Sequence, residues 1–145
     1  MPAKSEEWGA KMITLVYSKE LSAAIYTIEG DVDYSEIRDM VTKYYQGDLT
    51  KYTIGDYSKA NPDKHLTSEQ TKLLGFQMGA LGKARPNGYD LIVVPGLLQY
   101  GIARMYSGYA QIISQDKNKL QTKVFRTKED AVAFIRENEK PDKKQ

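Results

Sequence analysis

Short apolar runs and amphipathic stretches alternate along almost the whole of this 145-residue chain. The apolar runs predict strands at residues 12–17, 23–28, 49–56, 89–94 and 123–126. Between most of them, apolar residues recur every three or four positions, which predicts helices at 33–45, 67–84, 97–115 and 127–138. The order β-β-α-β-α-β-α-β-α predicts an α/β fold with a mixed, mostly parallel sheet of four or five strands and covering helices.

Composition excludes several classes of function. The chain has no cysteine, so disulfides, thiolate metal sites and a cysteine nucleophile are excluded. Its one histidine, His65, lies in a polar stretch and is expected at the surface, with no partners for a triad or a metal site. The net charge is only +2 and the charges are interspersed, which argues against nucleic-acid binding. We therefore expect a non-catalytic protein that needs no metal or other cofactor.

The chain is expected to form one domain over residues 1–145, with flexible termini at 1–10 and 137–145. No stretch has the apolar core of a signal peptide or the roughly 20 apolar residues of a membrane helix. A cytoplasmic location is therefore expected. Tyrosine is over-represented, with 11 tyrosines against 3 phenylalanines. This excess suits either ordinary packing at the edge of a core, or an interface or ligand cleft.

Three of the four predicted helices begin with a side chain that can cap an N-terminus: Asp33, Thr67 and Thr127. The remaining helix follows Pro95 and Gly96, which supply no side-chain oxygen. Its first N–H groups need other partners, which water, a side chain of the helix or a bound anion can provide.

Two groups of residues are candidates for a ligand site. Asp56 and Tyr57 follow a predicted parallel strand, and ligands of open α/β sheets bind beyond the carboxyl ends of such strands. Gly96, Tyr100 and Arg104 lie at the uncapped helix and suit an anionic or polar ligand. The alternatives are a structural salt bridge for Arg104 and a structural role for Asp56. Acid/base chemistry by Asp56 and Tyr57 is a third possibility, without a second group to support it.

Gly75, Gly79 and Gly82 fall on the side of their predicted helix opposite Leu74 and its apolar neighbours. Each glycine in a helix destabilises the fold by about 0.5–1 kcal/mol relative to alanine. A strip of three glycines is therefore expected to have a structural or functional cause. Glycines let another backbone approach closely. The strip therefore predicts a contact face for a partner protein or for a second copy of the chain. The alternative is a helix that tolerates its glycines.

Three stretches resemble one known family. They read Pro-Asn-Gly at 86–88 before Leu-Ile-Val-Val-Pro at 91–95, Tyr-Gly-Ile-Ala-Arg-Met-Tyr at 100–106, and Val-Phe-Arg-Thr-Lys-Glu-Asp-Ala at 124–131. Together they resemble the STAS-like proteins grouped as SpoIIAA-like, or anti-sigma-factor-antagonist-like. The resemblance extends over residues 17–135 and is strongest from Arg85 onward.

The resemblance implies a regulatory domain that binds a partner protein. In the better-known relatives a kinase modifies a serine in an Asp-Ser-Ser-Gly run at the start of the second long helix. Here Thr67 and Ser68 occupy that place without the run, and they are the candidates for modification. The resemblance thus favours a non-catalytic regulatory or protein-interaction domain. The alternative is a protein that binds a small anionic ligand or a lipid head group at the helix after Pro95 and Gly96.

Overall fold

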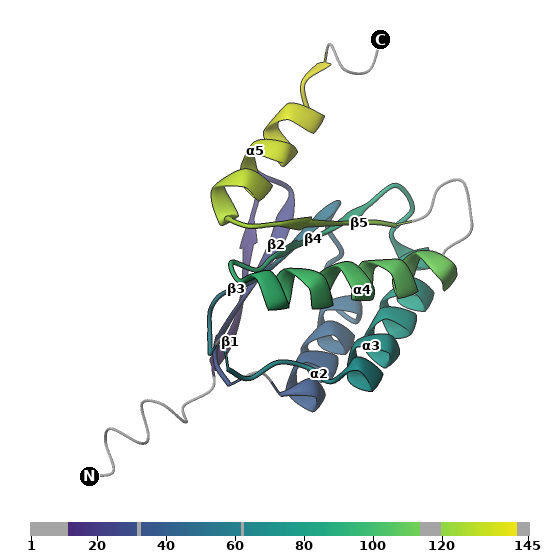
Figure 1. The fold of residues 1–145 in the computed structure, drawn as a ribbon. Coiled ribbons are helices and arrows are strands. Elements are labelled where there is room, and N and C mark those ends of the chain that lie inside the picture. The colour runs from purple at the N-terminus through teal and green to yellow at the C-terminus, as the bar shows by residue number, and fades with distance from the viewer. Residues whose placement is uncertain (1–11, 32, 62, 114–119, 142–145) are drawn as a thin grey trace.

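The computed structural model describes residues 12–31, 33–61, 63–113 and 120–141 (Figure 1). The predicted α/β class and the predicted order of elements are confirmed. The predicted flexible segment 1–10 and the predicted helix end at 115 lie outside the described residues. The elements are β1 (Met12–Ser18), β2 (Ala23–Gly30), α2 (Tyr34–Tyr45), β3 (Tyr52–Ala60), α3 (Ser68–Leu81), the 3₁₀ turn η1 (Gly82–Ala84), β4 (Tyr89–Val93), α4 (Leu97–Ile113), β5 (Gln121–Phe125) and α5 (Lys128–Asn138).

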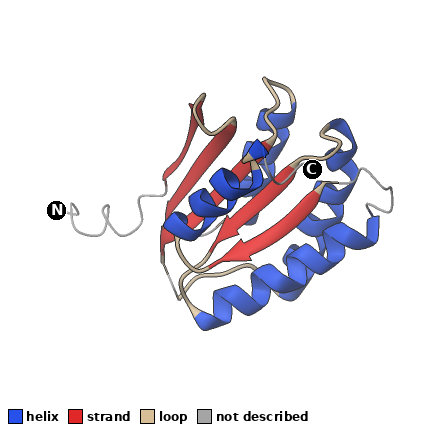
Figure 2. Cartoon of the chain, turned by 90° about the horizontal axis from the view of Figure 1, so that it is seen from above, coloured by secondary structure: helices blue, strands red, loops and turns tan. Residues whose placement is uncertain are grey.

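The five strands form one sheet in which their spatial order is their order along the chain, β1-β2-β3-β4-β5. The first two strands are an antiparallel hairpin, as predicted, and the other neighbouring pairs are parallel. Parallel crossovers are nearly always right-handed, so three crossovers in the same direction place their helices on the same face. Accordingly α2, α3 and α4 cover one face, and α5 alone packs on the other (Figures 1 and 2).

Each face of the sheet has its own apolar core. Along β4 and the residue after it, Ile92 and Val94 pack on the side of the three helices, whereas Leu91 and Val93 pack on the side of α5. This alternation follows from the two-residue period of a strand. It explains why β4 reads as a continuous apolar run, because both of its faces are covered.

Strand β3 is longer at its carboxyl end than the sequence predicts. The predicted strand ends at Asp56, but β3 continues to Ala60 because β2 extends to Gly30 beside it. A bulge between Thr27 and Glu29 shifts the register, after which Glu29 pairs with Lys59 and Gly30 with Ala60. Asp56 therefore lies within the strand rather than beyond its end.

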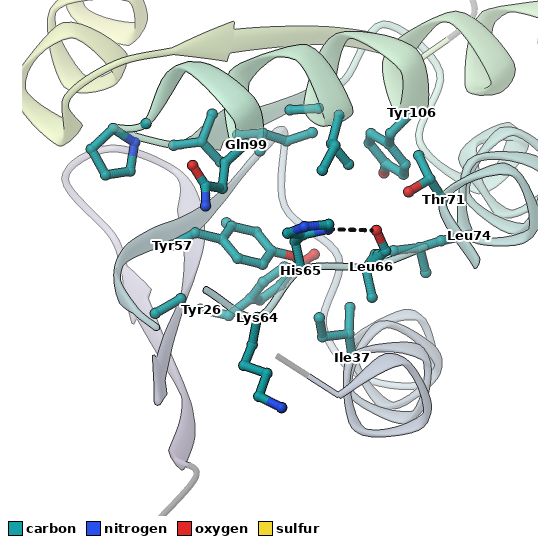
Figure 3. Close-up of a pocket in the computed structure, with 18 of the residues that line it drawn as sticks. Tyr26, Ile37, Tyr57, Lys64, His65, Leu66, Thr71, Leu74, Gln99 and Tyr106 are labelled. Atoms are coloured by element: carbon teal, nitrogen blue, oxygen red, sulfur yellow. Dashed lines mark hydrogen bonds between the residues drawn. The ribbon is translucent and has the colours of Figure 1, made fainter. Parts of the chain in front are cut away.

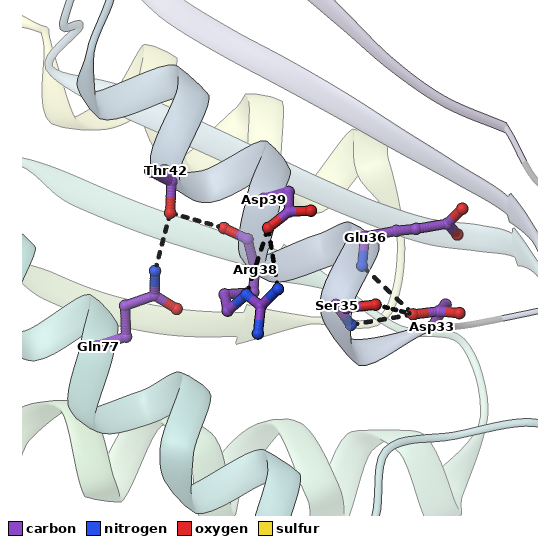
Figure 4. A network of polar contacts seen from close by, with 7 residues as sticks. All are labelled: Asp33, Ser35, Glu36, Arg38, Asp39, Thr42 and Gln77. Atoms are coloured by element: carbon purple, nitrogen blue, oxygen red, sulfur yellow. Dashed lines mark hydrogen bonds and ion pairs between the residues drawn. The ribbon is translucent and has the colours of Figure 1, made fainter.

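The three predicted side-chain caps are present. Asp33 Oδ1 accepts hydrogen bonds from the N–H groups of Ser35 and Glu36 at the start of α2 (Figure 4). Thr67 forms a full capping box with Gln70, and Thr127 caps α5 through the N–H of Asp130. Helix α2 is also tied to α3, because Gln77 Nε2 donates to Thr42 Oγ1 (Figure 4). The caps thus begin each helix at the residue that the sequence predicts, within one position.

The glycine strip of α3 does not face outward, and the prediction of an exposed contact face is wrong. Gly75, Gly79 and Gly82 are buried within the chain. A Cβ at Gly75 would lie 2.7 Å from Tyr109 Cβ and 2.9 Å from the Tyr106 carbonyl oxygen. The close approach that the glycines permit is therefore made within the chain, by α4 at Gly75 and by Leu120 at Gly82. On the apolar side Leu74 and Met78 are buried as well, whereas Leu73 is exposed.

The C-terminal helix is anchored to β3 through its last turn. The Tyr52 hydroxyl donates to Glu139 Oε2 over 2.6 Å and accepts from Asn138 Nδ2 over 2.8 Å. Lys51 Nζ lies 2.7 Å from the same Glu139 oxygen. The chain is thus held against the sheet as far as Glu139, which lies inside the 137–145 segment expected to be flexible.

Candidate functional site

A cavity of about 320 Å³ lies between the sheet and the three helices α2, α3 and α4 (Figure 3). Strands β2, β3 and β4 form its floor, and the loop from β3 to α3 closes one side. Most of its lining is apolar, with side chains from every surrounding helix. The apolar side chains of the lining include Ile37, Val41, Leu74, Met78, Ile92 and Ala103.

Tyr26 brings an unsatisfied hydroxyl to this cavity. Its side chain rises from β2, and only 6% of the residue is exposed. The hydroxyl is buried without a hydrogen-bond partner among the described residues. Burial, together with the nearby Asp90 carboxylate, raises the pKa of Tyr26 well above its ordinary value. A neutral buried hydroxyl without a partner costs about 1–3 kcal/mol relative to a satisfied one.

Asp90 is a carboxylate in the floor of the cavity, on β4, and is 3% exposed. Its Oδ2 accepts a 2.6 Å hydrogen bond from the Tyr106 hydroxyl of α4, and its Oδ1 accepts from Thr53 Oγ1 at 3.1 Å. Burial raises the pKa of Asp90, although both hydrogen bonds and the charge of Arg85 act in the opposite direction. The buried acid is thus held in place by hydrogen bonds from β3 and α4.

Arg85 supplies the positive charge that balances Asp90. The guanidinium is buried between α2 and the sheet and is linked to Asp90 through Thr53, whose Oγ1 accepts from Arg85 Nη1 at 3.3 Å. Despite this guanidinium, burial raises the pKa of Tyr45 to about 12. Arg85 donates to the carbonyl oxygens of Thr50, Lys51 and Tyr89 and to the hydroxyls of Tyr45 and Thr53.

Further polar side chains of the lining come from β3 and from the loop that follows it. Tyr57 of β3 projects into the same space as Tyr26 (Figure 3), and burial raises its pKa. The loop contributes Lys64, His65 and Leu66 to the lining, and the Lys64 ammonium points away from the cavity (Figure 3). His65 Nδ1 lies 3.1 Å from the Leu66 carbonyl oxygen. As predicted, His65 is an exposed residue.

Of the first candidate pair, the structure places Tyr57 in the cavity and Asp56 outside it. Because neighbours in a strand point to opposite faces, Asp56 faces the α5 side. There its Oδ1 accepts hydrogen bonds from the backbone N–H and the hydroxyl of Ser58, at 3.0 and 2.7 Å. The two residues therefore do not form a joint site. The strand order also never reverses, so the sheet has no switch point at which an edge crevice would open.

The second candidate group is also divided. Gly96 lines the cavity, and its carbonyl oxygen accepts the first bond of α4 from the Tyr100 N–H at 2.8 Å. The Gln99 side chain folds back over Gly96 and occupies the place that a Cβ would take. Neither Tyr100 nor Arg104 lines the cavity, and Arg104 is exposed.

A cation does lie at the start of α4, but it is Arg126, which was not among the site candidates predicted from the sequence. Its guanidinium donates two hydrogen bonds to the Pro95 carbonyl oxygen, at 3.1 and 2.7 Å, and lies 5.6 Å from the Tyr100 ring centre. The structure therefore does not bring Gly96, Tyr100 and Arg104 together as a site. Among the described side chains, Gly101 and Gly108 have nothing within 4 Å of an added Cβ, which leaves the ridge around Arg104 open.

Thr67 and Ser68, the candidates for modification, are both exposed at the start of α3. The Thr67 hydroxyl accepts the Gln70 N–H at 3.1 Å, and the Thr67 N–H donates to the Gln70 side chain at 3.0 Å. Thr67 therefore has a structural role as the cap. Modification of either residue stays a prediction.

Sequence reasoning missed Tyr26, Asp90, Tyr106 and Arg85, which build the polar end of the cavity. One signal was present, because Asp90 is a single acid inside an otherwise apolar strand. Within the described residues no group of three or more His, Asp or Glu side chains is placed to bind a metal ion. Likewise, none of the helices that the structure describes is long and apolar enough to cross a membrane.

The chain matches no protein-family model and no curated protein. Among solved structures, it is similar to an uncharacterised protein of the DUF3478 family with a SpoIIAA-like fold, from Shewanella loihica PV-4. The two chains share 17% identity, with a TM-score of 0.49, over 86% of this chain and 93% of the other. The likeness concerns the fold alone.

Proposed function

We propose that this domain binds a small, mostly apolar molecule in the cavity between its sheet and helices α2, α3 and α4. The observation that carries the proposal is the Tyr26 hydroxyl, which is buried in this cavity with no hydrogen-bond partner among the residues that the structure describes. A polar group buried in this way destabilises an empty protein, whereas a ligand atom that bonds to it removes the cost. Ligand sites of proteins are mostly apolar cavities with a few such polar groups.

The size of the cavity supports a ligand of about two fused rings. Protein pockets for small molecules begin near 300 Å³, and this cavity has about 320 Å³. An apolar cavity of about 150 Å³ holds one benzene ring. Tyr26, Tyr57 and Tyr106 add three aromatic rings to its lining, which suits a flat apolar ligand.

Binding rather than turnover is the proposed activity. Each Asp90 oxygen already accepts a hydrogen bond, from Tyr106 and from Thr53, and Arg85 balances its charge. A group held in this way suits recognition better than proton transfer. The lining contains no serine and no cysteine that would serve as a nucleophile for His65.

The regulatory role expected from the sequence resemblance is compatible with this proposal. Helices α2, α3 and α4 all border the cavity, so occupancy of the cavity can alter the surface that these helices present. The earlier argument for a partner face, the glycine strip, no longer supports it. We therefore propose the regulatory role as a ligand-dependent interaction between a partner protein and the surface that α2, α3 and α4 form.

Naphthalene is a suitable probe, because it is uncharged, rigid and has two rings. We expect saturable changes in the ¹H–¹⁵N spectrum of the full chain at amides around the cavity, such as those of Met78, Ile92 and Ala103. The blocking variant is Gly55→Leu. A Cβ at Gly55 lies at ordinary contact distances of 3.6 and 3.7 Å from Tyr57 and Tyr26, so the longer side chain extends into the cavity.

Gly55→Ala is the matched control, since it adds only the Cβ and should bind naphthalene nearly as the wild type does. Ala103→Phe blocks the cavity from the helical side and serves if Gly55→Leu does not fold. Spectral changes that persist in both blocking variants would place the probe elsewhere. The absence of saturable binding in the wild type would refute the proposal.

A further inference from the structure

We infer that the ligand carries an uncharged hydroxyl, as an alcohol or a phenol, at the end that reaches Tyr26 and Asp90. This inference rests on the proposed function and specifies the class of molecule that the cavity accepts. It follows from three features of the cavity floor: an unpartnered hydroxyl, a carboxylate with acceptor capacity left, and a counter-charge that is already present.

Tyr26 and Asp90 act at the same end of the cavity. In the sheet, Tyr26 of β2 is opposite Gly55 of β3, and the neighbouring Thr53 is opposite Asp90 of β4. The Tyr26 ring lies against Gly55, with Cδ2 at an ordinary contact distance of 3.7 Å from where a Cβ would stand. Tyr26 and Asp90 therefore both face the cavity from neighbouring parts of the sheet. Besides burial, Asp90 raises the pKa of Tyr26 more than Arg85 lowers it, which agrees with this closeness.

The charges of the floor exclude an anionic head group at this end. Asp90 lines the cavity, whereas its counter-charge Arg85 is not part of the lining and lies beyond Thr53, on the same side of the sheet. A carboxylate or phosphate of a ligand would thus face the Asp90 carboxylate directly in a poorly hydrated space, where repulsion between like charges is strong. The anionic ligand considered from the sequence is therefore not the class that fits this cavity.

A cationic ligand group fits no better, because Arg85 already balances Asp90 through Thr53. A second cation would be buried without a counter-charge. A ketone or ether accepts from Tyr26 but offers nothing to Asp90. A hydroxyl does both, since its oxygen accepts from Tyr26 and its proton can go to a carboxylate oxygen that has a lone pair left.

The test compares three two-ring probes on the full chain: naphthalene, 2-naphthol and 2-naphthoate, at neutral pH where 2-naphthol is uncharged. From the net value of one to two hydrogen bonds, 2-naphthol should bind about tenfold more tightly than naphthalene. Binding of 2-naphthoate should be weaker than that of naphthalene. In Tyr26→Phe the advantage of 2-naphthol should largely disappear, while naphthalene binding is unchanged.

Tyr109→Phe is the matched control, because Tyr109 does not line the cavity and should leave the order of affinities unaltered. Equal affinities of naphthalene and 2-naphthol would overturn the inference and leave the proposed function standing. Tightest binding of 2-naphthoate would overturn it in favour of an anionic ligand. If none of the three probes binds, both the inference and the proposed function are wrong.

Discussion

The substitution Gly75→Ala adds a single methyl group at a place where α3 and α4 pack closely. Its Cβ would lie 2.7 Å from Tyr109 Cβ and 2.9 Å from the Tyr106 carbonyl oxygen. Ordinary contacts begin at 3.4 Å, and one of these two atoms belongs to the backbone. The side chains cannot simply rotate away, so the two helices must move apart by about 0.7 Å at this point, as in other overpacked cores.

Two opposing effects set the magnitude. Overpacking of this kind costs about 1–3 kcal/mol. Alanine in place of glycine in a helix interior gains about 1 kcal/mol. We therefore expect Gly75→Ala to lower the free energy of unfolding by about 1 kcal/mol, with an upper bound near 2 kcal/mol.

Gly108→Ala is the matched control, because it makes the same chemical change within α4 where an added Cβ has no atom within 4 Å. It should raise the free energy of unfolding by about 0.5–1 kcal/mol. The difference between the two variants isolates the contact of α3 with α4. Urea unfolding followed by circular dichroism measures both values, at unchanged m-values. If Gly75→Ala were as stabilising as Gly108→Ala, the close packing of these helices would be wrong.

Three further predictions concern the polar groups. Tyr106→Phe removes the hydrogen bond to Asp90 and should lower the free energy of unfolding by about 1.5–3 kcal/mol, against less than about 0.5 kcal/mol for Tyr109→Phe; denaturant unfolding decides, and equal effects would contradict it. Thr67→Ala removes the cap of α3 and should cost about 1 kcal/mol in the same assay, whereas Ser68→Ala should cost much less. Because burial raises the pKa of Asp90, the folded chain binds its proton more tightly than the unfolded chain does. Between that raised pKa and the ordinary 3.8, the stability of the wild type relative to Asp90→Asn should rise as the pH falls, and a fall would refute the burial of this acid.

Most of the fold could be predicted from short sequence patterns, namely helix caps and apolar periodicity. The caps at Asp33, Thr67 and Thr127 and the apolar run that became β4 each act within a few residues, so their signals are complete in the sequence. The end of β3 was mispredicted because its last residues are held by pairing with β2, which lies about 30 positions earlier. Polar side chains such as Ser58 and Lys59 gave no sign of that pairing.

Most residues of the site were not predicted, because the site depends on which face of its strand or helix each side chain occupies. The residues Asp56 and Tyr57 are neighbours in sequence, yet only Tyr57 reaches the cavity. The glycines of α3 were correctly grouped on one side, but the sequence did not reveal that α4 covers that side. Asp90 was read as part of an apolar strand. An acid in such a strand, and a glycine such as Gly55 in the next, were the available signs of a polar site with a close neighbour.

The agreement between strand order in the sheet and strand order in the chain has a consequence for how the protein assembles. Each new strand joins the edge left by the strand before it, and no strand has to enter between two that are already paired. A chain emerging from the ribosome can therefore extend the sheet in the order of synthesis, with β1 as one edge and the newest strand as the other. The walls of the cavity are complete once α4 has emerged. Strand β5 then joins the edge of β4, and α5 covers the second face of the sheet.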